Sequence, residues 1–114
     1  MKENKIALFE EKEIRKVWHN EDWYFSVVDV IAILTENDYQ KARNYWKWLK
    51  TKLIEEGSQL VSDTNQLKMK AFDGKMRDTD VLETKGILRL IQSIPSPKAE
   101  PFKQWLAQVG ARAH

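Results

Sequence analysis

Apolar residues recur at helical spacing over residues 38–56, directly before Gly57. Six of them fall on one face of a helix of about five turns: Tyr39, Ala42, Tyr45, Trp46, Leu49 and Leu53. The opposite side of this helix gathers polar and basic residues: Gln40, Arg43, Asn44, Lys47, Lys50 and Thr51. Trp48 lies beside the basic residues and outside the apolar stripe. The pattern predicts a helix with one buried face and one exposed basic face.

Shorter apolar patterns before this helix predict strands. Residues 6–10 and 13–18 are predicted to form two short strands, with residues 11–12 as the tight connection between them. In the second strand Ile14, Lys16 and Trp18 alternate with Arg15 and Val17. The aromatic run 23–25 predicts a third strand that enters the core. An antiparallel sheet is therefore expected near the start of the chain.

Three more helices are predicted from capping and helix-breaking residues. Ser26, with Asp29 three positions later, is typical of a helix N-terminus and predicts a helix over residues 27–34. A second helix is expected from residue 83 or 84 to residue 93, because two prolines follow it closely. The last helix is predicted over residues 97–110, with a serine before it as the cap and a proline at its first position.

The clearest local signal is Asp73-Gly74, which separates two alternating runs, residues 67–72 and 75–80. An Asp-Gly pair in this position is typical of a two-residue β-hairpin, with Phe72 opposite Lys75. That register places four residues on one face of the hairpin: Leu67, Met69, Ala71 and Met76. The other face then carries four cations around one aromatic ring: Lys68, Lys70, Phe72, Lys75 and Arg77.

Residues 58–65 are expected to form a polar connection ahead of the hairpin, anchored by Leu60 and Val61. Together the elements predict an α+β fold, with a small, mostly antiparallel sheet and a basic β-hairpin packed against about four helices. A hydrophobic content of 42% and five tryptophans supply a modest core. The 114 residues therefore fit a single domain, residues 1–114, with its core over about residues 6–110.

Composition also indicates the cellular compartment. The chain has no cysteine, which excludes disulfides and thiol chemistry and fits a reducing cytoplasm. Its longest apolar run, residues 27–34, contains an aspartate and is far too short to span a membrane. The N-terminus does not lead into the apolar core of a signal peptide. A cytoplasmic protein without a membrane partner is expected.

The charge is unevenly distributed, although the formal net charge is only +2. Residues 40–77 hold nine Lys or Arg against four acids, and the remainder holds ten against thirteen. A basic middle is what a surface that faces a polyanion needs, so nucleic acid is the predicted partner. The alternative for any one of these lysines is an ordinary solvated side chain.

Residues for catalysis do not converge in this sequence. His19 and His114 are its only imidazoles, and both lie in regions expected to be exposed. No glycine-rich phosphate loop is present, and Asp78 with Asp80 is better interpreted as a strand end leading into a helix than as a cation site. We therefore expect no enzyme activity, no catalytic residues, no metal and no cofactor.

Five segments resemble a known family: residues 9–15, 23–31, 41–46, 80–91 and 93–106. In this order they resemble the BRO-N domain of phage and prophage antirepressors, and within that group the branch of the DNA-damage-inducible protein D type. The resemblance implies a small α+β fold that binds DNA and regulates transcription. It also implies a C-terminal region that is absent from this chain, which is then either a piece of a longer protein or a stand-alone version.

Two functions are consistent with these residues. In the first, the domain binds DNA through the basic helix face and the basic hairpin: Gln40, Arg43, Asn44, Lys47, Trp48, Lys50, Lys68, Lys70, Phe72, Lys75 and Arg77. In the second, Trp48 docks on a repressor or on a repair or recombination protein, or mediates a homodimer, without direct DNA binding. Phe72 has its own alternative, which is to pack under another part of the domain.

Overall fold

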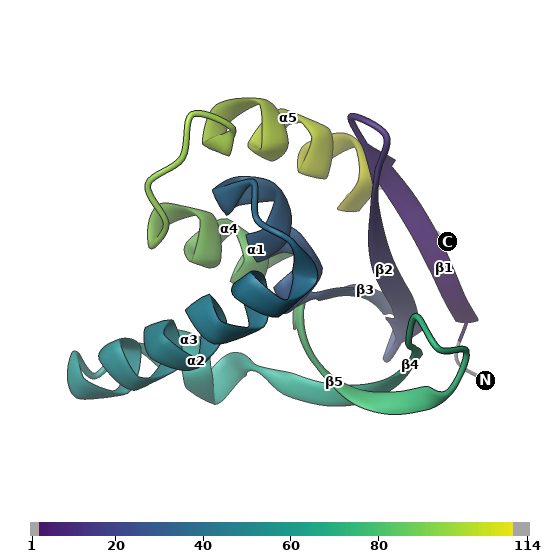
Figure 1. Cartoon of the computed structure of the whole chain (residues 1–114), viewed down its shortest axis with the longest axis horizontal. Coiled ribbons are helices and arrows are strands. Elements are labelled where there is room, and N and C mark those ends of the chain that lie inside the picture. Colours follow the sequence, from purple (N-terminus) through teal and green to yellow (C-terminus); the bar gives the residue numbers. More distant parts are fainter. Residues whose placement is uncertain (1–2, 111–114) are drawn as a thin grey trace.

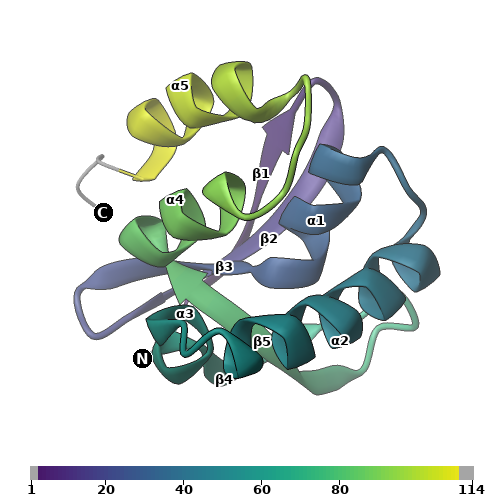
Figure 2. The same cartoon turned by 90° about the vertical axis from the view of Figure 1, so that its left-hand side faces the viewer.

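The computed structural model describes residues 3–110. They form an α+β fold whose five strands make one antiparallel sheet in the order β1-β2-β3-β5-β4. The strands are β1 (Glu3–Phe9), β2 (Lys12–His19), β3 (Asp22–Ser26), β4 (Asn65–Lys70) and β5 (Met76–Glu83). The helices are α1 (Val27–Thr35), α2 (Tyr39–Glu55), α3 (Gln59–Asp63), α4 (Thr84–Gln92) and α5 (Ala99–Gly110). The helices gather on one side of the sheet (Figure 1), and α2 crosses in front of β5 in the view of Figure 2.

The first three strands follow their predicted positions, and both connections are two-residue turns. Residues 10–11 join β1 to β2 and residues 20–21 join β2 to β3, and all four have positive φ angles between 49° and 69°. Two consecutive positive φ angles match the right-handed twist of a hairpin. The first turn therefore lies one residue earlier than predicted, which lets Phe9 pair with Lys12.

The predicted helix starts are confirmed for α1 and α2. Ser26 Oγ accepts a hydrogen bond of 3.3 Å from the backbone N–H of Asp29, and Asp38 accepts one of 2.8 Å from that of Lys41. Gly57 follows α2 with a φ of 72°, the left-handed conformation expected of a cap. Within residues 3–110, no helix has both the length and the apolar character needed to cross a bilayer.

The helices differ from the sequence prediction in two places. The polar connection before the hairpin contains α3, a short helix capped by Ser58 and held to the core by the buried Leu60. So short a helix has no repeating apolar pattern to reveal it. Helix α5 begins at Ala99 and not at residue 97, because the residues before it form a turn in which Ser96 Oγ accepts from the N–H of Lys98.

The sheet is buried on both faces near its centre because it is strongly curved. Residues of β3 and β5 alternate between the main core under the helices, which includes Phe25 and Leu82, and a second core. The second core consists of Val17, Tyr24, Leu67, Met69 and Val81. In Figure 1 the β4–β5 hairpin curves away from β3, and its tip returns toward β2.

The Asp73-Gly74 signal locates the hairpin correctly, but its loop is one residue longer than predicted. The backbone N–H of Ala71 donates to the carbonyl of Lys75 at 2.8 Å, and the N–H of Gly74 donates to the carbonyl of Ala71 at 3.0 Å. The loop therefore holds three residues, 72–74, with Gly74 at a φ of 85°. A tight turn followed by a left-handed glycine is the usual three-residue hairpin.

The longer loop shifts the register of the hairpin by one residue, so Met76 and Arg77 each lie on the face opposite to the predicted one. Lys70 lies opposite Met76, and Met69 lies opposite Arg77. Because side chains alternate along a strand, Met76 shares a face with Lys68 and Lys70, where it is 50% exposed. Arg77 instead shares the face of Met69. The prediction of one basic hairpin face was wrong, since its cations lie on both faces.

Candidate nucleic-acid interface

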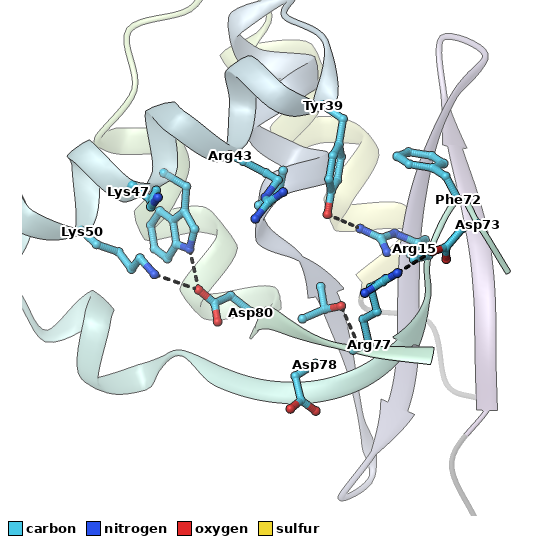
Figure 3. Close-up of a pocket in the computed structure, with 14 residues that line it drawn as sticks. Arg15, Tyr39, Arg43, Lys47, Lys50, Phe72, Asp73, Arg77, Asp78 and Asp80 are labelled. Carbon is cyan, nitrogen blue, oxygen red and sulfur yellow. Dashed lines mark hydrogen bonds and ion pairs between the residues drawn. The ribbon is translucent and has the colours of Figure 1, made fainter. Parts of the chain in front are cut away.

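Helix α2 and the hairpin lie side by side and form the two walls of a cleft of about 580 Å³ (Figure 3). We call it the α2–β5 cleft. Helix α2 lines it with Tyr39, Arg43, Trp46, Lys47 and Lys50. The hairpin loop and β5 line it with Ala71, Phe72, Asp73, Arg77, Asp78, Thr79 and Asp80. The two segments that were predicted separately from the sequence as basic surfaces thus face each other.

The carboxylate of Asp80 joins the two walls. Its Oδ2 accepts hydrogen bonds from Trp46 Nε1 at 2.7 Å and from Lys50 Nζ at 3.2 Å, and its Oδ1 accepts one from Gln66 Nε2 at 3.0 Å. Partial burial by itself raises the pKa of Asp80, but these donors outweigh it and hold the pKa below its usual value. Asp80 therefore stays ionised and bonded to α2.

Arg15 of β2 closes one end of the cleft and was not among the predicted site residues. Its Nε and Nη2 donate to the two oxygens of Asp29 at 2.9 and 3.0 Å, and Nη1 donates to the carbonyl of Lys70 at 3.2 Å. Burial lowers the pKa of Arg15, but the hydrogen bonds to Asp29 and its negative charge outweigh this effect, so the pKa is raised overall. The sequence feature that could have indicated Arg15 is Asp29, because a carboxylate within an apolar helix needs a cationic partner.

The tip of the hairpin carries Phe72, which is 78% exposed. Its ring meets the ring of Tyr39 edge-on at 5.0 Å, and the guanidinium carbon of Arg15 lies 5.9 Å from its centre. The alternative that Phe72 packs under another part of the domain is wrong, because most of its side chain faces solvent. In the same loop, Asp73 holds Arg77 in an ion pair that lowers the pKa of Asp73.

Basic side chains outnumber acidic ones around the cleft. Five cations line it, Arg15, Arg43, Lys47, Lys50 and Arg77, against three carboxylates. Arg43 and Lys47 have no ion-pair partner within residues 3–110, whereas the other three cations are each paired with an aspartate. The uncompensated charge of the cleft therefore lies on α2.

Trp48 does not belong to this cleft. It follows Trp46 by two residues, so it points about 200° around the helix from the buried side. Its ring is 54% exposed and contacts the ring of Tyr45 at 5.5 Å and the ammonium of Lys52 at 5.2 Å. Any partner of Trp48 therefore approaches α2 from a different direction.

The structure separates the predicted binding residues into two groups. Five of them line the cleft: Arg43, Lys47, Lys50, Phe72 and Arg77. Six do not: Gln40, Asn44, Trp48, Lys68, Lys70 and Lys75. In the second group, Gln40 and Asn44 bond to each other on the exposed side of α2 at 3.4 Å, and Lys68 pairs with Asp78 at 3.2 Å.

The described residues show no metal site. Within residues 3–110, no group of three or more histidine, aspartate or glutamate side chains is arranged to hold a metal ion. His19 is half-buried and not exposed as predicted, since its ring packs edge-on against Tyr24 at 5.6 Å. His114 lies outside the described residues.

Comparison with protein families gives one match. The model for the BRO family, N-terminal domain, matches residues 13–109. This stretch runs from β2 to α5 and contains both walls of the cleft as well as Arg15. The comparisons with curated proteins and with solved structures gave no match.

Proposed function

The chain belongs to the BRO family, as a member of that family's N-terminal domain, and we propose that it binds DNA in the α2–β5 cleft. In this proposal the domain serves a prophage antirepressor-like regulator of transcription and acts by binding, without catalysis. The narrower resemblance to the DNA-damage-inducible protein D type stays a prediction.

One observation carries the proposal: a basic helix and a hairpin, far apart in the sequence, form the two walls of a single cleft. Cations on a rigid helix can contact successive phosphates, and such contacts supply most of the affinity for DNA. Arg43 and Lys47 are the first candidates, because no carboxylate competes for them within the described part of the chain. Lys50 and Arg77 would exchange an aspartate for a phosphate.

Asp78 suits a second kind of contact. It lines the cleft, and its carboxylate is exposed and bonded to Lys68 at 3.2 Å. A carboxylate that is held near phosphate-binding cations can accept a hydrogen bond from the amino group of cytosine. The cations would thus position the DNA, and Asp78 would be available to read a base edge.

Binding of a fluorescently labelled duplex and of the matching single strand, measured by anisotropy at two salt concentrations, tests the proposal. The expected result is measurable binding at low salt that falls steeply as salt rises, because phosphate contacts release counterions. Absence of binding to either DNA at low salt would overturn the proposal.

A second candidate function rests on Trp48, whose exposed ring points away from the cleft. An exposed tryptophan on a rigid helix is typical of a protein-docking surface. In this alternative Trp48 binds a repressor or a repair protein, or mediates a homodimer. Sedimentation of the protein alone and with candidate proteins tests it: Trp48→Ala should abolish association and leave DNA affinity unchanged.

A further inference from the structure

A second hollow of about 450 Å³ lies on the other side of the hairpin tip, between the tip and the β1–β2 pair. We call it the hairpin groove. Arg15, Ala71 and Phe72 line both this groove and the α2–β5 cleft. The two hollows therefore adjoin at the hairpin tip, with these three residues between them.

The hairpin groove differs from the cleft in its chemistry. Its apolar surface comes from Ile6, Met69, Ala71 and Phe72. Five charged residues complete its lining: Lys5, Glu13, Arg15, Asp29 and Lys70. Ile6 is 56% exposed, so two large apolar side chains, Ile6 and Phe72, flank a largely apolar slot. Apolar surface with a few polar groups suits a flat heterocycle that has polar edges.

We propose that the hairpin groove holds one unstacked base of the DNA strand whose phosphates lie in the α2–β5 cleft. This inference rests on the proposed function and specifies its substrate as DNA with an unpaired base. Phe72 offers the stacking platform, because most of its side chain is exposed and its contact with the Tyr39 ring is T-shaped and not stacked. Arg15 supports it, since its guanidinium is fixed by Asp29 and lies beside the Phe72 ring.

A base inside a duplex is stacked on both faces, so it must leave the helix to enter the groove. Extrusion is costly for a paired base and least costly for a base that is already unpaired. Stacking on an aromatic side chain recovers part of that cost. The protein is therefore expected to prefer DNA with a single unpaired base over a fully paired duplex.

Three duplexes of one sequence test this preference by anisotropy at one low salt concentration. The first is fully paired, the second carries one bulged base, and the third carries an abasic site in place of the bulged base. The base bulge should bind about tenfold more tightly than the other two, as about 1.4 kcal/mol of stacking predicts. Equal binding of the base bulge and the abasic bulge would show that bending, and not the base, is recognised.

Phe72→Ala should abolish the preference for the base bulge, and Phe72→Trp should keep it. Because Phe72 is mostly exposed, the thermal unfolding midpoint of the Phe72→Ala variant should equal that of the wild type. An unchanged midpoint shows that the variant has lost the contact with the base and not its fold. Met76→Ala is the matched control, since Met76 is an exposed apolar residue of the same hairpin that lines neither hollow. If the paired and bulged duplexes bind equally, this inference fails and DNA binding in the cleft stands; if none binds, the proposed function fails as well.

Discussion

Trp46 Nε1 donates a hydrogen bond of 2.7 Å to Asp80 Oδ2, and this bond fixes helix α2 to strand β5. The indole is almost fully buried, so its N–H needs an acceptor inside the protein. Asp80 accepts from Lys50 and Gln66 as well. One carboxylate thus sets the distance between the two walls of the cleft.

Trp46→Phe should lower the free energy of unfolding in urea by at least about 1.5 kcal/mol, because hydrogen bonds to charged groups contribute about 1.5–3 kcal/mol. Trp105→Phe is the comparison, at a tryptophan that is half-buried and so leaves a smaller cavity. Its indole N–H also donates a single bond, of 2.8 Å, but to the neutral carbonyl of Leu8. That variant should lose about 1 kcal/mol for the bond. Equal losses would contradict the role given to the charge of Asp80.

The pKa of Asp80 predicts how stability depends on pH. The pKa is lower in the folded protein than in the unfolded chain, so ionised Asp80 stabilises the fold above pH about 4, the ordinary carboxyl value. This contribution is lost as pH falls through the lowered pKa. Between pH 5 and pH 2, urea unfolding should therefore show a smaller loss of stability for Asp80→Asn than for the wild type. Asp78→Asn, which alters an exposed carboxylate, should follow the wild type.

The sequence predicted α2 and its apolar stripe well because a helix repeats its pattern over many residues. Four stripe positions are buried, Ala42, Trp46, Leu49 and Leu53, and the helix begins one residue after its predicted start, with Asp38 as its cap. The hairpin was harder, since the Asp-Gly pair marks the turn but does not determine whether its loop holds two residues or three. That single residue decided on which face Arg77 lies.

The candidate site could be predicted only in part because it depends on curvature. Nothing in the local pattern of β2 indicates that the hairpin tip returns to it, and that return makes Arg15 part of the cleft. The helical period placed Arg43 and Lys47 correctly on one side of α2. It also placed Trp48 next to the basic residues, although the cleft uses only the part of that face nearest to the buried stripe.

Replacing Arg43 and Lys47 together with alanine should weaken DNA binding and flatten its salt dependence. Loss of two phosphate contacts should reduce the slope of log K against log salt by about 1.8 for duplex DNA. The control is Lys41→Ala with Lys52→Ala, which removes the same charge from the same helix but outside the cleft. Anisotropy titrations at several salt concentrations measure both. Equal slopes for the two double variants would mean that net charge, and not the cleft, attracts the DNA.

Asp73→Asn should strengthen DNA binding, because Asp73 occupies Arg77 in the free protein. Asparagine keeps the side-chain oxygen that accepts from the N–H of Lys75 at 3.0 Å, so the hairpin loop should be preserved. Released Arg77 would then contact one more phosphate and make the salt slope steeper by about 0.9. Asp78→Asn also removes one carboxylate from the cleft, but it releases Lys68, which does not line it. That variant should leave the slope unchanged, so identical slopes for the two variants would rule out Asp73 as a competitor of DNA for Arg77.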